Sequence, residues 1–185
     1  MRIIILLKVY KNGKLVLQQP SKCLLSNFRN SIYLLFTTHR ACSYNCYSEY
    51  KFSVNAPDND DSYGIVVGSG AMPVTPDDTE LSEKITHGTG TGQLDYDETE
   101  VSYEVDYVNK RGYIYVKRSF KNLSDSDVIV RECGIVAWFI LGHRCRALGE
   151  WRIDEKRLIV RDVLSEPVTV HPYEQLVIHY TFQIG

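Results

Sequence analysis

The sequence predicts a mainly β protein: an antiparallel β-sandwich, jelly-roll or Ig-like, with one short N-terminal amphipathic helix. Two stretches carry this prediction. Residues 101–120 alternate apolar and polar side chains around a Gly-containing loop, and residues 175–184 alternate without interruption. The composition agrees, because 13 Tyr against 2 Met suits sheets better than helical bundles.

The alternation over 101–120 predicts a hairpin with a definite register. If residues 109–112 form the loop, Val105 lies opposite Val116, and Glu104 lies opposite Lys117. One side of this hairpin is then almost wholly apolar and is expected to face the core. It consists of Val101, Tyr103, Val105, Tyr107, Ile114, Val116 and Phe120, with Arg118 as its one charge.

The other elements follow in chain order. Residues 1–18 form a hairpin that turns at Asn12-Gly13, a dipeptide that favours tight hairpin turns. Residues 21–37 form the helix, because Leu24, Phe28 and other apolar side chains recur there at helical spacing. Further strands are expected over residues 50–54, 63–70, 128–141, 158–164, 168–170 and 175–184.

Length and composition bound the possibilities. A chain of 185 residues is expected to be one domain, with residues 1–62 packed on a core formed by 63–185. The net charge of −2 provides no basic field for nucleic acid. No apolar run approaches the ~20 residues of a membrane span, and no signal peptide is visible. Five cysteines, an odd number, argue against a fully paired disulfide framework.

The glycine-rich segments look most like binding loops. The run from Gly88 to Gly92 has phosphate-loop spacing, but a strand follows it where a phosphate site needs a helix N-terminus. Ordinary turns, or a loop that contacts a neighbouring subunit, are therefore the better interpretations. The candidate interface residues are Gly68, Pro73, Pro76, Gly88, Gly90, Gly92, Tyr113 and Tyr115.

No metal, cofactor or catalytic residue is predicted. Cys42 and Cys46 could hold zinc with His39, and His143 and Cys145 could complete the site, but structural zinc sites usually show a second close ligand pair. The acidic run at 58–62 lacks the glycine position and the bidentate Glu of a calcium loop.

Catalytic patterns are also missing. The sequence has no Gly-x-Ser-x-Gly elbow. Glu104 and Asp106 have a spacing near that of paired glycosidase carboxylates, but an ion pair of Glu104 with Lys117 explains that pattern better. We therefore expect the protein not to be an enzyme.

Arg118 is the residue that most needs a partner. It lies in the apolar row of the predicted hairpin, and an unpaired buried guanidinium would be very costly, so an acid or an aromatic face is expected as its partner. Glu132 and Asp162 also lie in apolar strands, so a structural ion pair of Arg118 with one of them is predicted. In the alternative, the charged groups lie at the rim of the fold and only their stems are buried.

Seven segments between 64 and 184 occur in an order that resembles a family of uncharacterised β-rich, virion-associated proteins of tailed bacteriophages and related viruses. They are GIVVGSG at 64–70, PVTPDDTEL at 73–81, HGTGTGQLDY at 87–96, RSFKN at 118–122, VRECGIV at 130–136, LIVRDVLSEPVTV at 158–170 and LVIHYTFQI at 176–184. The resemblance transfers no catalytic residue.

The resemblance implies a virion structural protein, made in the host cytoplasm and placed on the capsid, neck or tail. Its partners would be capsid, portal or tail subunits, in a homo-oligomer or symmetric multi-copy assembly, without nucleic acid or membrane. The alternative is a receptor- or carbohydrate-binding module of a viral fibre. That module would have a shallow site rimmed by aromatic side chains such as Tyr113, Tyr115, Trp138 and Trp151.

Overall fold

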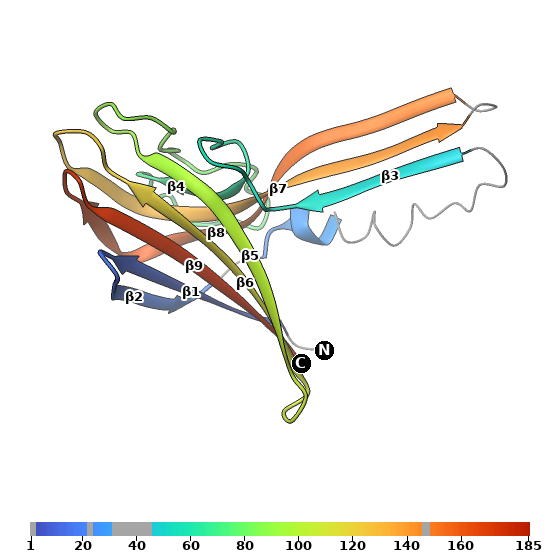
Figure 1. Cartoon of the computed structure of the whole chain (residues 1–185), viewed down its shortest axis with the longest axis horizontal. Coiled ribbons are helices and arrows are strands. Elements are labelled where there is room, and N and C mark those ends of the chain that lie inside the picture. The colour runs from blue at the N-terminus through green and yellow to red at the C-terminus, as the bar shows by residue number, and fades with distance from the viewer. Residues whose placement is uncertain (1–2, 22–23, 31–45, 146–148) are drawn as a thin grey trace.

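The structure, a computed structural model, describes residues 3–21, 24–30, 46–145 and 149–185. These residues form two antiparallel β-sheets and very little helix (Figure 1). In chain order the strands are β1 Ile3–Lys11, β2 Lys14–Pro20, β3 Cys46–Ser53, β4 Gly64–Gly68, β5 Asp95–Asp106, β6 Arg111–Lys121, β7 Val128–Cys145, β8 Gly149–Val170 and β9 Gln175–Ile184. The mainly β, antiparallel prediction is confirmed.

The first sheet has the strand order β2-β1-β9-β6-β5. Its β1–β2 hairpin turns at Asn12 and Gly13 with φ of 47° and 77°, the left-handed backbone that this dipeptide tolerates. Because β1 lies between β2 and β9, the N-terminal hairpin belongs to the same sheet as the C-terminal strand. The predicted strand at 175–184 is confirmed as β9.

The second sheet is organised around β7, which pairs with β8 over its whole length. On the opposite edge, β3 pairs with residues 138–145 of β7, and β4 pairs with residues 132–136. Strands β3 and β4 therefore share one edge of β7 end to end. The sequence predicted a strand at 158–164 and another at 168–170; both are parts of the single long strand β8.

The two sheets share one hydrophobic core. The first sheet contributes Leu7, Val9, Phe120, Leu176 and Ile178, and the second contributes Ile65, Val67, Val130, Ile135 and Val160, all fully buried. In the first sheet, the two-residue periodicity of β9 explains why its apolar side chains enter this core. Every second residue from Leu176 to Tyr180 is buried, and the residues between them are half-buried.

The register of the β5–β6 hairpin differs from the predicted one. Val101 lies opposite Val116, and Glu104 lies opposite Tyr113 rather than Lys117. The loop begins two residues earlier than predicted, because the Asp106 carboxylate accepts hydrogen bonds from the N–H groups of Val108 and Asn109. The partner of each β5 residue moves by four positions, an even number, so the faces of the strands keep their predicted composition.

The predicted apolar side of this hairpin is only half buried. Val116 and Phe120 lie in the core, but Tyr103 and Tyr107 are 82% and 85% exposed. The reason is visible in Figure 1, where the hairpin continues beyond the end of the second sheet and projects from the body. We refer to the projecting part, residues 101–115, as the hairpin arm.

A second projection leaves the body in another direction. It consists of β3, residues 138–145 of β7 and the first part of β8, which run together away from the core (Figure 1). We refer to these strands as the three-stranded arm. Two β projections from one core are the most distinctive feature of the molecule.

The predicted helix at 21–37 is not confirmed: Ser21, Leu24 and Leu25 are not helical, and Leu24 forms a β-bridge with Val160. Residues 26–30 are helical, and residues 31–37 lie outside the described residues. Leu25 and Phe28, on its apolar side, pack against the core. In the described part of the chain, no helix has the length and apolar character needed to cross a bilayer.

Candidate functional site

Arg118 is buried and has the aromatic face of Tyr96 beside it, but its hydrogen-bond partners are not the predicted carboxylates. Its guanidinium donates from Nε to the carbonyl of Asp97 at 2.6 Å, and from Nη1 to the carbonyls of Tyr63 and Ile65 at 3.0 Å each. Nη2 donates to the carbonyls of Pro57 and Asp60 at 3.2 and 2.7 Å. The predicted ion pair of Arg118 with Glu132 or Asp162 is therefore wrong.

The physical reason is that backbone carbonyls converge on Arg118 from three segments. They come from the loop around residues 57–60, from the start of β4 and from β5, which lie far apart in sequence. One side chain thus satisfies polar backbone groups that secondary structure leaves without partners. We refer to these carbonyls around Arg118 as the carbonyl cage. A sequence pattern shows neither where carbonyls point nor which loops meet, so the cage could not be predicted from the sequence.

Glu132 instead pairs with Arg161. The guanidinium donates to Glu132 Oε2 from Nε at 2.9 Å and from Nη2 at 2.7 Å, and Nη1 reaches Asp78 Oδ2 at 2.6 Å. Both members are buried: Glu132 is 0% and Arg161 is 2% exposed. The sequence correctly indicated that Glu132 and Arg161 are charged residues within apolar strands. The predicted pairing of Glu132 was with Arg118, whereas the observed pairing is between Glu132 and Arg161.

The buried Glu132 also holds the loop that follows β4, residues 68–83, in place. The other oxygen of Glu132 accepts hydrogen bonds from the Ser82 hydroxyl and the Glu83 N–H at 2.9 Å each. Burial alone would raise the pKa of Glu132, but these hydrogen bonds and Arg161 outweigh it, so the pKa is lowered and the carboxylate stays charged. Residues 68–83 are thereby held against the second sheet.

Asp162 has partners of its own. Its Oδ2 accepts hydrogen bonds from the Ser21 hydroxyl at 2.7 Å and from the Tyr180 hydroxyl at 3.2 Å. The same Tyr180 oxygen lies 3.2 Å from the sulfur of Cys133, which is fully buried. Burial raises the pKa of both Cys133 and Tyr180, so the thiol and the phenol stay protonated. The cluster is a structural link between β7, β8 and β9.

The glycine loop at 87–92 is folded back on itself. The Gly90 N–H donates to Gln93 Oε1 at 3.1 Å, and Gln93 Nε2 donates to Thr86 Oγ1 at 3.3 Å. Gly88 has a φ of 154°, and a Cβ there would collide with the Gln93 side chain. The Gly90 N–H is therefore taken by Gln93 and the Gly88 N–H by the carbonyl of Leu94, so these two amides are not free to bind an anion.

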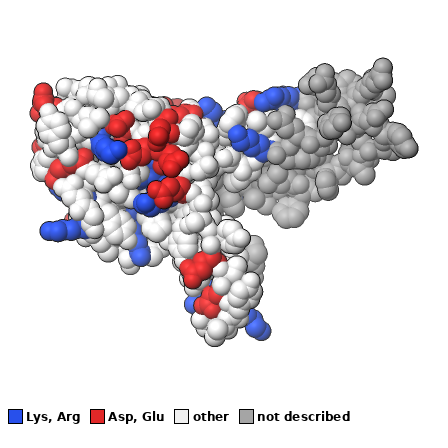
Figure 2. Space-filling model, viewed as in Figure 1, with Lys and Arg blue, Asp and Glu red and all other residues white. Residues whose placement is uncertain are grey.

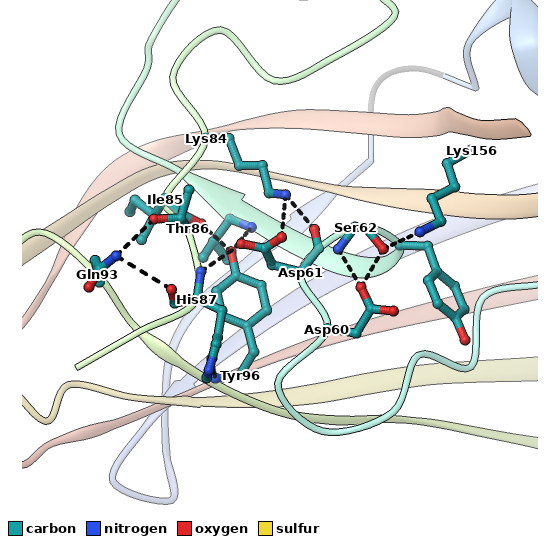
Figure 3. A network of polar contacts seen from close by, with 12 residues as sticks. Asp60, Asp61, Ser62, Lys84, Ile85, Thr86, His87, Gln93, Tyr96 and Lys156 are labelled. Carbon is teal, nitrogen blue, oxygen red and sulfur yellow. Dashed lines mark hydrogen bonds and ion pairs between the residues drawn. The ribbon is translucent and has the colours of Figure 1, made fainter. Parts of the chain in front are cut away.

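Figure 3 shows how this region is attached to the loop before β4. Asp61 accepts hydrogen bonds from Lys84 Nζ at 2.9 Å and from the His87 N–H at 2.7 Å. Burial alone would raise the pKa of Asp61, but the hydrogen bonds from His87 and Lys84 outweigh it and lower the pKa. Beneath them, the Tyr96 hydroxyl donates to the carbonyl of Ile85. These contacts fix residues 84–87 in place.

A half-open pocket of about 210 Å³ lies beside this network, with an apolar floor and a rim that includes Ser62, Lys84 and Lys156. The Ser62 hydroxyl donates to Asp60 and accepts a hydrogen bond from Lys156 (Figure 3). Burial alone would raise the pKa of Asp60, but hydrogen bonds from Ser62 outweigh it and lower the pKa. The lowered pKa makes Asp60 a weaker base than an ordinary carboxylate.

The candidate interface residues differ in their accessibility. Gly68 is buried, with a Cβ position 2.6 Å from the carbonyl of Glu83 and 2.8 Å from Glu132, so it cannot contact a partner. Pro73 and Pro76 are exposed, in the loop that follows. Gly90 and Gly92 are exposed and Gly88 is half-buried. Of the predicted loop residues, Pro73, Pro76, Gly90 and Gly92 are accessible to a partner, whereas Gly68 is not.

Tyr113 and Tyr115 lie on the opposite side of the hairpin arm from Tyr103. Their rings are parallel within 5°, with centroids 6.3 Å apart, and the Tyr115 ring lies 5.7 Å from that of His179. The Tyr115 hydroxyl donates to Glu104 at 2.9 Å. Both tyrosines are half-buried in this row.

Trp138 has close neighbours on its ring. Lys51 Nζ lies 3.4 Å from the ring centroid, and the indole N–H donates to Asp154 at 2.7 Å. The side chain of Trp151 lies outside the described residues. The backbone of the three-stranded arm places Cys46 opposite Cys145, whereas His39 and Cys42 lie outside the described residues. Among the residues whose side chains are described, no three His, Cys, Asp or Glu gather as metal ligands do.

The strongest candidate for a functional surface is the hairpin arm, a surface that the sequence analysis assigned to the core. Its apolar side includes Val101 and Val105, 44% and 46% exposed, with Tyr103 and Tyr107. In Figure 2 the arm shows broad uncharged surface between a few charged groups. Exposed apolar surface of this extent marks sites of interaction with other macromolecules.

An apolar cavity of about 140 Å³ lies at the base of the arm, between the two sheets. Ile114 of the arm and the core residue Val116 line it, together with Phe52 and Ile135 of the second sheet and Phe182 of β9. The apolar side of the arm is therefore continuous with an opening into the core. Comparison of the chain with protein-family models, with curated proteins and with solved structures finds no match.

Proposed function

We propose that the protein is a structural protein of a virus particle, which acts by binding other protein subunits and not by catalysis. The hairpin arm is the principal contact surface, and the exposed loop around Pro73 and Pro76 is a second one. The particle setting is supported by the resemblance of residues 64–184 to virion-associated proteins of tailed bacteriophages. A jelly-roll or Ig-like arrangement of the two sheets belongs to the same proposal.

The observation that carries the proposal is the contrast within one face of one hairpin. Val116 is 3% exposed, whereas Tyr103, on the same face farther along the arm, is 82% exposed. An exposed apolar strand face costs solubility, and proteins usually avoid it unless a partner covers it. Tyrosine is also well suited to interfaces, because it brings a large rigid apolar body with a polar tip.

Quantitative mass spectrometry of purified particles of the encoding virus tests the proposal. We expect the chain at a fixed copy number relative to the capsid subunit. The double variant Tyr103→Ser/Tyr107→Ser should lower this copy number at least fivefold. As the matched control, Leu15→Ser removes an apolar side chain that is 50% exposed at the far end of the first sheet, and it should leave the copy number unchanged.

Two results would contradict the proposal. The first is the absence of the chain from washed particles in which the capsid subunit is readily counted. The second is a copy number that both variants leave unaltered, because the arm would then not be the contact surface.

One observation favours a second candidate, a carbohydrate-binding module. The parallel rings of Tyr113 and Tyr115 lie beside the Glu104 carboxylate, and sugar rings can pack on aromatic side chains while their hydroxyls bond to carboxylates. Glycan-array binding by the full chain that Tyr115→Ser abolishes would support it. Binding that depends on Tyr103 instead would point back to the apolar side of the arm.

A further inference from the structure

Strand β5 is the last strand of its sheet, so one of its edges faces away from β6. The hydrogen bonds of Thr99 identify the residues of that edge. Its N–H donates to the carbonyl of Ala56 at 2.8 Å, and its carbonyl accepts a hydrogen bond from the Asn55 side chain. Because backbone groups alternate between the two edges of a strand, those of Val101, Tyr103 and Val105 point the same way as those of Thr99.

The chain covers this edge only at its base. Residues 55–59 lie along it, and the Asn59 N–H donates to the carbonyl of Tyr96 at 2.9 Å. In the described part of the chain, no backbone group bonds to the edge beyond Thr99. The hairpin arm thus carries a row of three residues whose N–H and C=O groups are open to another strand.

The side chains around this edge determine which sequence an added strand needs in order to fit. Those of Val101, Tyr103 and Val105 form the exposed apolar side of the arm, so the added strand must place apolar side chains there. The other side is acidic. Along β5 the charged residues are Asp95, Asp97, Glu98, Glu100, Glu104 and Asp106, without a lysine or arginine.

The charges nearest the open edge are incompletely balanced. Lys117 lies 3.1 Å from Glu100, but the Glu100 side chain remains 59% exposed. Glu104 accepts a hydrogen bond from the Tyr115 hydroxyl, which carries no charge. A strand with lysine or arginine on this side would complement the edge, whereas β5 of a second copy would bring carboxylates against carboxylates.

We propose that the open edge of β5 accepts an extended segment of another protein chain in which apolar residues alternate with lysine or arginine. The segment pairs with Val101, Tyr103 and Val105 and adds a sixth strand to the first sheet. Main-chain hydrogen bonds hold it, its apolar side chains cover Tyr103, and its basic side chains meet Glu100 and Glu104. This inference rests on the proposed function and specifies the partner.

Fluorescence anisotropy with labelled nine-residue peptides tests the proposal on the full chain. Three peptides are compared: one alternates Val and Lys, one alternates Val and Glu, and one has the Val and Lys composition in blocks. We expect only the alternating Val–Lys peptide to bind. Equal binding of the block peptide, or of the Val–Glu peptide, would overturn the proposal, because neither the alternation nor the charge would then matter.

Two variants at one position separate backbone pairing from side-chain contact. Tyr103→Pro removes the outward N–H, which β6 does not use, and proline is tolerated on edge strands. Tyr103→Ser removes the ring but keeps the N–H. We expect Tyr103→Pro to weaken binding at least tenfold and to weaken it more than Tyr103→Ser does. Equal affinities of these two variants, at equal melting temperatures, would overturn strand addition.

A third variant tests the charge, and a further measurement tests the second copy as the occupant. Glu104→Lys should weaken binding of the Val–Lys peptide at least threefold; unchanged affinity would contradict the basic partner. Sedimentation velocity of the chain alone should show a monomer, or a dimer that persists in the Tyr103→Pro variant. A dimer that Tyr103→Pro dissociates would mean that a second copy occupies the edge, and it would overturn the proposal. If Tyr103→Ser/Tyr107→Ser lowers the copy number in particles but Tyr103→Pro does not, the proposed function stands and the edge pairing fails.

Discussion

The guanidinium carbon of Arg118 lies 4.8 Å from the centre of the Tyr96 ring, and both side chains are almost fully buried. The ring covers one face of the cation, and backbone carbonyls take its N–H donors in the plane. A buried cation is thus stabilised without a carboxylate partner. The loop at 57–60, strand β4 and strand β5 meet at this one residue.

Replacing Arg118 with methionine should therefore be strongly destabilising. Methionine fills much of the volume but leaves the carbonyls of Tyr63, Ile65 and Asp60 without these donors. We expect a loss of about 3–5 kcal/mol in the free energy of unfolding, measured by urea denaturation. Lys117→Met is the matched control on the exposed side of the same strand and should change it by less than about 0.5 kcal/mol. Equal stabilities would refute the carbonyl cage.

Glu132 and Asp78 make the stability depend on pH. Both carboxyls face Arg161, and in each case the hydrogen bonds outweigh the effect of burial and lower the pKa from the ordinary values of 4.5 and 3.8. A group whose pKa is lower in the folded state stabilises the fold above its unfolded pKa, and this stability is lost as the pH falls.

The free energy of unfolding should consequently decrease as the pH falls below about 4.5. The variant Glu132→Gln should be less stable at pH 7 and should show a flatter pH dependence over the acid range. Denaturation curves from pH 3 to pH 7 check this. Parallel curves for the two proteins would show that Glu132 does not carry the effect.

Loss of an apolar side chain should lower the stability in the buried part of the hairpin but not in its exposed part. Val116→Ala leaves a cavity in the core and should cost about 1–3 kcal/mol of stability. Tyr103→Ser should change stability by less than about 0.5 kcal/mol, since the side chain is 82% exposed. Thermal melts of both variants, followed by circular dichroism, compare them. A large loss for Tyr103→Ser would mean that something in the chain covers the arm.

Gly70 should not tolerate a side chain. A Cβ at this position would collide with the Ser82 hydroxyl and lie 2.6 Å from Glu132 Oε1. Gly70→Ala is therefore expected to lower stability by about 1–3 kcal/mol through displacement of the 68–83 loop. Gly112→Ala has open space around its Cβ position and serves as the control. A melting temperature of Gly70→Ala equal to that of the control would contradict the tight packing.

Cys133 should be inert in the folded protein. It is fully buried, and burial raises the pKa of its thiol, so little thiolate forms and reagents cannot reach it. Iodoacetamide at pH 8, with the modified residue identified by peptide mass spectrometry, should label Cys133 only after unfolding. Rapid labelling of the native protein would show that β7 opens.

The fold could be predicted from the sequence where apolar and polar residues alternate without interruption. The alternation from Leu176 to Ile184 predicted β9, and Asn12-Gly13 predicted the first turn, because these signals are local. The loop of the β5–β6 hairpin was placed wrongly because Gly112 is the more obvious turn residue. The Asp106 carboxylate, which caps the loop, and Lys110, with a φ of 54°, set the turn instead.

The candidate site was less accessible, for a physical reason. Periodicity tells which side of a strand is apolar, but not whether another sheet covers that side. Val116 and Tyr103 belong to the same apolar row, and only the length of the second sheet separates the buried residue from the exposed one. The partners of Arg118 were out of reach for a similar reason, since carbonyls from distant loops have no pattern in the sequence.

Strand β7 has a mechanical consequence. At 18 residues it extends for about 60 Å and runs without a break from the core into the three-stranded arm, bonded to β8 along the way. Because β8 follows β7 directly in the chain, a pull along the arm would draw both strands in the same direction, and the hydrogen bonds of β7 with β4 would carry the load in shear. Tension on the three-stranded arm would therefore reach the core at β4, on the edge of the second sheet.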